Sequence, residues 1–221
     1  MSVFRFENIS FFRYLKFIYI NLSSKNIFKI DDINVNFSHS DYQFNILKAK
    51  GINSIKMSDY IRKKYFLARK KILIKNKKDI ICYNPSKSSA FFKKFIDKNK
   101  DLNFLPLKNF TLDEVIYHLS KSKIYIDFGF HPGQDHLPRE AAVLKNCIIT
   151  NREGSAGLFN DVPINNEFKF TEINSNFINL RNKIDIIFNN FPKELKKFSF
   201  YNRYLFNQKK VFSKQISKIF F

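Results

Sequence analysis

The chain has 221 residues, of which 44% are hydrophobic and 26% charged. This composition is typical of an ordinary globular protein and excludes a chain too polar to build a core, and the length suits one large domain or one and a half smaller ones. The net charge of +20 suggests a polyanionic partner, but only eight of the 39 basic residues are Arg and no nucleic-acid-binding motif is present, so we expect compositional bias and no specific nucleic acid.

The N-terminal segment, residues 1–22, is apolar but is interrupted by charged side chains. It lacks the uninterrupted run of about 18 apolar residues expected of a membrane-spanning helix, and it lacks a small-residue cleavage site. We therefore expect a core segment, with contact to a membrane surface as the alternative. The interrupting residues are Arg5, Glu7, Arg13 and Lys16.

Residues 35–57 are less periodic than the rest, and they favour a strand, a helix and a second strand. Residues 60–79 are strongly basic, which is typical of a connecting helix or a linker. The two cysteines, Cys82 and Cys147, have no metal-ligand spacing, which predicts buried reduced thiols.

From residue 80 onward, short apolar runs alternate with segments of helical period. Ser88 or Ser89 is a candidate N-cap, and Thr111 and Glu114 have the spacing of a capping box. This alternation predicts βαβ units and a parallel sheet. The predicted strands are 79–83, 103–107, 123–128 and 147–150, and the predicted helices are 88–100, 110–122 and a helix opening at Pro138.

After Thr150 the sequence predicts a polar loop to about residue 160, followed by two helices at 173–191 and 192–221. The second of these helices is basic and aromatic, and we expect it to pack back over the domain.

The stretch 125–157 holds most of the glycines and two of the four histidines of the chain. Two of its polar loops follow the predicted strands that end near Asp127 and at Thr150. Because the carboxyl ends of parallel strands meet at one edge of a sheet, we expect these loops to lie side by side and to bind a ligand. The helix that opens at Pro138 would direct free N–H groups toward an anion.

The residues of this stretch resemble a known family. The run "DFGFHPGQDHLPREAAVLKNCIIT" followed by "GSAG" is similar to the donor-binding half of GT-B glycosyltransferases, and "YNPSKSSAFFKKFI" resembles the first strand, basic loop and helix of that half. The resemblance covers about residues 33–170, with residues 36–61 similar to the end of the acceptor half.

The resemblance implies roles for individual residues. Glu140 would accept hydrogen bonds from the ribose hydroxyls of a nucleotide-sugar, and a cation at the diphosphate would stabilise the leaving group. Lys87, with the hydroxyls of Ser86 and Ser88, would meet the diphosphate, Gly154 and Ser155 would place backbone N–H groups beside it, and Arg139 is a second candidate cation.

The sequence also departs from the family pattern. Many retaining members carry a second glutamate eight positions before the ribose-binding one, and here that position is Pro132. His131, Asp135 or His136 could take its place, and we expect His131 and Asp135 to be catalytic. The stereochemical course stays open. We expect no metal site, because outside "HPGQDH" the histidines have no acidic residue at the short spacing of metal ligands. We also expect no cofactor.

The sequence thus predicts an α/β fold, with a Rossmann-like parallel sheet in residues 80–221 and a reduced acceptor-side segment and linker in residues 1–79. The predicted function is sugar transfer from a nucleotide-diphosphate donor to a glycan or lipid-linked acceptor, as in surface polysaccharide synthesis. We expect a cytoplasmic protein, with peripheral contact to the inner face of the membrane as an alternative. The other readings are a non-catalytic remnant that binds a nucleotide or a partner subunit and, last, a nucleic-acid-binding protein.

Overall fold

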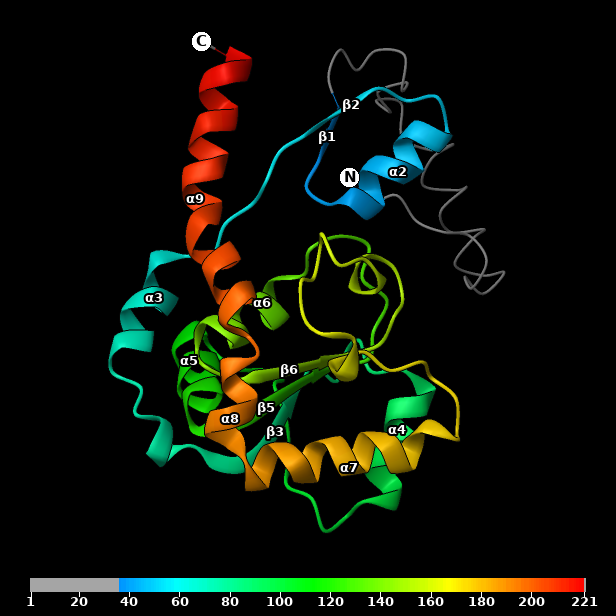
Figure 1. Ribbon diagram of the computed structural model, residues 1–221, viewed down its shortest axis with the longest axis vertical. Helices are drawn as coiled ribbons and strands as arrows, with labels where there is room; N and C mark the ends of the chain where they lie inside the picture. The colour runs from blue at the N-terminus through cyan, green and yellow to red at the C-terminus, as the bar shows by residue number, and fades with distance from the viewer. Residues whose placement is uncertain (1–35, 221) are drawn as a thin grey trace.

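The computed structural model describes residues 36–220, so the predictions for residues 1–35 lie outside the described part of the chain (Figure 1). Besides three short 3₁₀ helices, the described residues form fourteen α-helices and β-strands. They are β1 (Asn36–Ser38), α2 (Asp41–Ala49), β2 (Ser54–Lys56), α3 (Lys63–Lys70), β3 (Lys78–Tyr83), α4 (Ala90–Lys98), β4 (Phe104–Pro106), α5 (Leu112–Lys121), β5 (Ser122–Asp127), α6 (His136–Val143), β6 (Cys147–Thr150), α7 (Asn176–Asn189), α8 (Phe191–Lys196) and α9 (Ser199–Phe220).

The main sheet has the strand order β4-β3-β5-β6, and every neighbouring pair in it is parallel. The predicted α/β fold with a Rossmann-like sheet is therefore confirmed. In this order β4 lies on one side of β3, and the next strand in the chain, β5, lies on the other side. Right-handed crossovers consequently place α4 on one face of the sheet and α5 and α6 on the other.

Each helical layer is held by its own packing. On one face, the rings of Phe91 in α4 and Phe177 in α7 lie 4.7 Å apart. On the other face, α3 contacts both α5 and α6. The sheet lies between the two layers, and all four residues of β6 are buried, as its continuous apolar run predicted.

Aromatic side chains fill the space between α4 and the sheet. Phe92 is fully buried, and its ring stacks 5.5 Å from that of Phe128 and 6.3 Å from that of Phe95. Burial of a Phe side chain contributes roughly 1.5–3 kcal/mol. Phe128 begins the loop after β5, so this packing anchors the loop at its first residue.

The helix starts agree with the sequence in two cases and differ in a third. Ser89 caps α4, and Thr111 and Glu114 form a complete capping box on α5. Helix α6 begins at His136, two residues before the predicted start at Pro138. Pro138 still lies in the first turn, where its missing N–H has no intrahelical partner to lose.

The C-terminal region contains one helix more than the sequence predicts. Residues 192–221 were expected to form a single helix, but α8 ends at Lys196 and α9 begins at Ser199. The chain turns at Phe198, which is 1% exposed and packs its ring 4.6 Å from that of Phe168. The break between α8 and α9 thus lies at a residue whose ring is part of the core.

The N-terminal described residues form the predicted strand, helix and strand, with β1 and β2 paired in parallel. The loop after β6 holds this unit, because Asp161 accepts hydrogen bonds from the backbone N–H groups of Asp41 (2.6 Å) and Tyr42 (2.9 Å). Helix α9 reaches the linker after β2, where Gln215 accepts from the backbone N–H of Ser58 at 2.8 Å.

No helix within residues 36–220 combines the length and the apolar character needed to cross a membrane.

Candidate functional site

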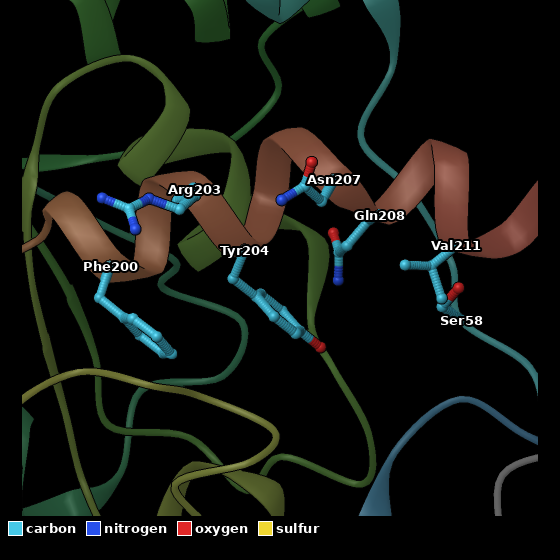
Figure 2. Close-up of a pocket in the computed structure, with 7 residues that line it drawn as sticks. All are labelled: Ser58, Phe200, Arg203, Tyr204, Asn207, Gln208 and Val211. Carbon is cyan, nitrogen blue, oxygen red and sulfur yellow. The ribbon is translucent and has the colours of Figure 1, made fainter.

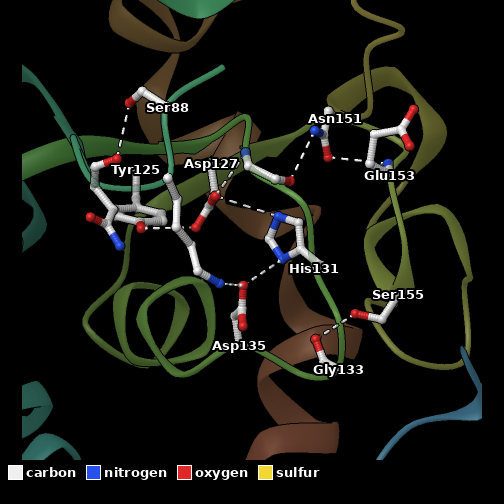
Figure 3. Close-up of polar contacts among 12 residues, drawn as sticks. Ser88, Tyr125, Asp127, His131, Gly133, Asp135, Asn151, Glu153 and Ser155 are labelled. Atoms are coloured by element: carbon white, nitrogen blue, oxygen red, sulfur yellow. Dashed lines mark hydrogen bonds and ion pairs between the residues drawn. The ribbon is translucent and has the colours of Figure 1, made fainter. Parts of the chain in front are cut away.

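The loops after β5 and β6 lie side by side. The strands are in register with Asp127 opposite Thr150, so both loops leave the sheet at the same edge. The loops then pair directly, with a parallel bridge between His131 and Gly154 and a 2.9 Å hydrogen bond from the Ser155 N–H to the His131 carbonyl. The expectation that these loops share one edge is confirmed (Figure 3).

Gly154 makes this pairing possible. Its φ is +63° and its ψ is −136°, a conformation that residues with a side chain rarely adopt. A Cβ atom at this position would lie 2.0 Å from the His131 carbonyl oxygen. Only glycine therefore allows the two backbones to approach this closely.

A third loop, residues 84–89 after β3, joins the same edge. The Ser89 N–H donates to the Phe128 carbonyl at 3.2 Å. Lys87 extends from this loop and its Nζ donates to Asp135 Oδ2 at 2.5 Å. We call this edge, formed by residues 84–89, 128–135 and 151–157, the loop edge.

Alternating charges lie beneath the loop edge (Figure 3). His131 is 1% exposed, with its Nε2 3.4 Å from Asp127 Oδ1 and its Nδ1 3.1 Å from Asp135 Oδ2. The Tyr125 hydroxyl donates to Asp127 at 3.0 Å, and Lys87 completes the row at Asp135. We call Lys87, Asp127, His131 and Asp135 the charge cluster.

The charge cluster favours an imidazolium at its centre. Burial lowers the pKa of His131, but the contact with Asp135 and the charge of Asp127 outweigh burial, so the pKa is raised. Burial likewise opposes ionisation of Asp135, but His131 and Lys87 hold the pKa of Asp135 below its ordinary value. Two carboxylates, one imidazolium and one ammonium balance each other in charge.

Three side chains of the charge cluster could be considered as metal ligands, because their ligand atoms lie within 4.8 Å of one another. They are Asp127, His131 and Asp135. The His131 ring, however, lies between the two carboxylates and presents a different nitrogen to each. A metal ligand set needs one ring nitrogen and both carboxylates around a common point. The arrangement therefore fits ion pairs better than a metal site.

The predicted catalytic pair differs in exposure. Neither ring nitrogen of His131 is accessible, and neither makes a well-aligned hydrogen bond. His131 thus contacts Asp135 rather than a ligand, whereas 19% of the Asp135 side chain is exposed. In this arrangement His131 can position and neutralise Asp135 from beneath.

The predicted phosphate-binding residues of the first loop lie at the loop edge. The Lys87 side chain is 35% exposed, and Ser86 is exposed. The Ser88 hydroxyl donates to the Asn84 carbonyl at 2.9 Å. A ligand phosphate at this loop would therefore meet the Lys87 ammonium first.

Both hydrogen-bond donors of Ser155, the backbone N–H and the hydroxyl, are used within the protein. Its N–H is bonded to His131, and its hydroxyl donates to the Gly133 carbonyl at 2.5 Å, with the residue fully buried. The expected hydrogen bond from the Ser155 amide to a phosphate is therefore not available in this structure. Ser155 instead holds the two loops together.

Arg139 and Glu140 have side-chain partners outside the charge cluster, although the Arg139 Nε also donates to the Asp135 backbone carbonyl at 3.2 Å. Arg139 is 1% exposed and donates to Asp59 Oδ2 at 2.8 Å, and its role as a second cation at the diphosphate stays a prediction. Glu140 is 8% exposed and faces Tyr65 of α3. Burial raises the pKa of Glu140, and the Tyr65 hydrogen bond offsets this only in part.

Sequence reasoning missed a pocket of about 270 Å³ beside α9 (Figure 2). It adjoins the loop edge, because Gln134 donates to the Tyr204 hydroxyl at 2.7 Å and accepts from Gln208 at 3.0 Å. The pocket residues come from segments about 70 or more positions away from the loop, so local patterns carried no signal. The lining residues are Ser58, Phe200, Arg203, Tyr204, Asn207, Gln208 and Val211.

Comparison with known proteins places the fold. No family model and no curated protein matches the chain by sequence. Among solved structures, Anabaena HepE in complex with UDP and glucose superposes with a TM-score of 0.57 at 10% identity, over 83% of this chain and 62% of HepE. The chain has the fold of the GT-B glycosyltransferases.

A second GT-B structure agrees. The catalytic domain of starch synthase IV from Arabidopsis thaliana, bound to ADP and acarbose, gives a TM-score of 0.50 at 11% identity. The match covers 83% of this chain and 55% of that domain. The chain therefore spans less than two thirds of the length of either GT-B structure.

Proposed function

We propose that this chain is the donor-binding part of a glycosyltransferase that transfers a sugar from a nucleotide-diphosphate donor to an acceptor. The observation that carries the proposal is the meeting of three strand-end loops at one edge, where the Lys87 side chain is 35% exposed and its ammonium contacts Asp135 of the charge cluster. In open parallel sheets this edge is where ligands bind. The two solved GT-B structures that resemble the chain contain UDP or ADP.

Lys87 is the proposed ligand of the diphosphate. A cation beside the leaving group stabilises the negative charge that develops as the sugar departs. Because His131 also contacts Asp135, Lys87 can turn from Asp135 to a phosphate without leaving that carboxylate uncompensated. This exchange gives Asp135 and His131 a role in setting the position of Lys87, with Ser86, Ser88 and Gly154 lining the same edge.

Glu140 remains the proposed ligand of the ribose hydroxyls. Its carboxylate faces Tyr65, so ribose binding requires the Tyr65 hydroxyl to be exchanged for a ribose hydroxyl. A carboxylate can accept hydrogen bonds from two vicinal hydroxyls, so the ribose would replace the hydrogen bond that Tyr65 gives up.

The proposed setting is the assembly of a surface polysaccharide in the cytoplasm, with a glycan or a lipid-linked glycan as acceptor. The domain division at residue 79 belongs to this proposal, with the β1–α2–β2 unit on the acceptor side. Contact with the inner face of the membrane would suit the net charge of +20.

Titration calorimetry with UDP, GDP and ADP tests donor binding. We expect at least one nucleotide to bind, and Lys87→Met to weaken that binding about 10- to 100-fold, since a hydrogen bond from a charged group contributes roughly 1.5–3 kcal/mol. Lys94→Met is the matched control, because Lys94 is an exposed lysine on the adjacent helix α4.

Two results would contradict the proposal. One is a folded chain that binds none of the three nucleotides at millimolar concentration. The other is an equal loss of affinity in the Lys87 and Lys94 variants, which would indicate general attraction by positive charge.

A further inference from the structure

A second polar group lies where the linker after β2 meets the start of α6. His136 Nε2 is 3.2 Å from Asp59 Oδ2, and Arg139 Nη2 is 2.8 Å from the same oxygen. The Arg139 side chain is 2% exposed, that of Asp59 35%, and that of His136 60%. A buried cation therefore fixes a half-buried carboxylate, which in turn contacts an exposed imidazole.

This arrangement suits proton transfer by His136. In the neutral tautomer whose Nε2–H donates to Asp59, the other ring nitrogen, Nδ1, has a free lone pair. Because the ring is exposed, this nitrogen can accept a proton from a bound hydroxyl. Burial opposes ionisation of Asp59, but the hydrogen bond and charge of Arg139 hold the pKa of Asp59 below its ordinary value. Asp59 consequently stays ionised and keeps the ring oriented, as a carboxylate does for a catalytic histidine.

The group lies next to the loop edge. His136 directly follows Asp135, whose carboxylate contacts Lys87. His39, from the turn between β1 and α2, approaches the same loop, because its Nε2 would lie 3.0 Å from a Cβ atom on Gly133. Three of the four histidines of a lysine-rich chain thus lie in or beside the 129–136 loop.

The α9 pocket provides space beside this group. Gln208 lines the pocket and accepts a 3.3 Å hydrogen bond from Arg139 Nη1, and Ser58, which also lines it, precedes Asp59. Figure 2 shows the rings of Phe200 and Tyr204 on one side of α9, along the pocket. Aromatic rings with a few amide groups are typical of small-ligand pockets and suit a sugar.

We propose that His136 is the proton acceptor for the attacking hydroxyl of an acceptor sugar, an inference that rests on the proposed donor binding. The acceptor oxygen forms a bond to the anomeric carbon of the donor while its proton passes to His136 Nδ1. The bond from that carbon to the diphosphate oxygen breaks, and its electron pair leaves with the nucleoside diphosphate beside Lys87. This single displacement inverts the anomeric configuration.

Donor hydrolysis by the full chain tests His136, with water in place of the acceptor. The probes are UDP-glucose, GDP-mannose and ADP-glucose, and the readouts are nucleoside diphosphate release and the anomer of the released sugar. We expect His136→Ala to lower the rate about 10²- to 10⁴-fold with the calorimetric affinity for the nucleoside diphosphate unchanged. His118→Ala, on the remote helix α5, is the matched control.

The pH profile provides a second readout. A general base acts only in its unprotonated form, so the wild-type rate should fall in acid, and His136→Ala should lose this dependence. The charged groups around His136 are Asp59 and Arg62 on the linker, His39 on the β1–α2 turn, and Arg139 and Glu140 on α6. Asp59→Asn should also slow hydrolysis, because the ring loses its orienting partner.

Three results would overturn the assignment. They are an unchanged rate in His136→Ala, a released sugar that retains the donor configuration, and a chain that binds the nucleoside diphosphate but hydrolyses none of the three donors. A chain that binds no nucleotide would instead overturn the proposed function itself.

Discussion

Individual residues of the loop edge were partly predictable. His131 and Asp135 stood out in the sequence because scarce polar side chains follow a predicted strand. The burial of His131 was not predictable, because it depends on Gly154 of another loop approaching His131. Arg139 was expected at the loop edge, and its Nε does donate to the Asp135 carbonyl there, but its Nη2 binds Asp59, 80 positions away in sequence.

Gly154→Ala should be among the more destabilising single substitutions. The added Cβ would meet the His131 carbonyl oxygen at 2.0 Å, at a φ of +63°. We expect the free energy of unfolding to fall by about 3 kcal/mol or more, since clash and strain add. Urea unfolding measures the change.

Gly51→Ala is the matched control for Gly154→Ala. Gly51 has a φ of +71°, but a Cβ atom there would meet nothing within 4 Å. We expect a loss of about 1 kcal/mol, which is the cost of the backbone conformation alone. Equal losses at the two glycines would contradict the close approach of the loops.

Elements were predictable where their signals are local. The capping box on α5 and the apolar runs of β3, β5 and β6 gave these elements the expected places. The start of α6 was misplaced because Pro138 was taken as the first helical residue, whereas it is the third. The break before α9 was missed because no glycine or proline marks it in the sequence.

A buried lysine directly before β3, bonded to the end of α5, gives an element-scale prediction. Lys77 is 6% exposed and donates to the carbonyls of Leu119 (3.0 Å) and Ser122 (2.6 Å). Burial lowers the pKa of Lys77 from 10.5 to about 7. Between these values the unfolded chain binds the proton and the folded chain does not, so stability should rise with pH.

Lys77→Met should remove this contribution. Between pH 7 and pH 9 the free energy of unfolding of the wild type should gain up to about 1.4 kcal/mol per pH unit relative to the variant. Urea unfolding at pH 7, 8 and 9 measures the difference, and other titrating groups cancel because both chains carry them. Parallel pH dependences would show that Lys77 keeps its ordinary pKa.

At the scale of the whole molecule, contacts between distant segments position the β1–α2–β2 unit. Asp161 caps α2 from 120 positions away, and α9 contacts the linker at Ser58. No sequence pattern marks such long-range contacts, although the α/β class followed from the alternating elements. The same contacts bring Asp59 to His136 and so place the proposed proton acceptor beside the loop edge.

Backbone amide chemical shifts of the isotope-labelled chain, recorded during titration with the nucleoside diphosphate that binds, test the central claim most directly. We predict that the largest changes fall together in residues 84–89, 128–136 and 151–157, because one diphosphate contacts all three loops. Changes confined to one of these loops, or centred on a distant surface such as the outer face of α7, would contradict a shared donor site.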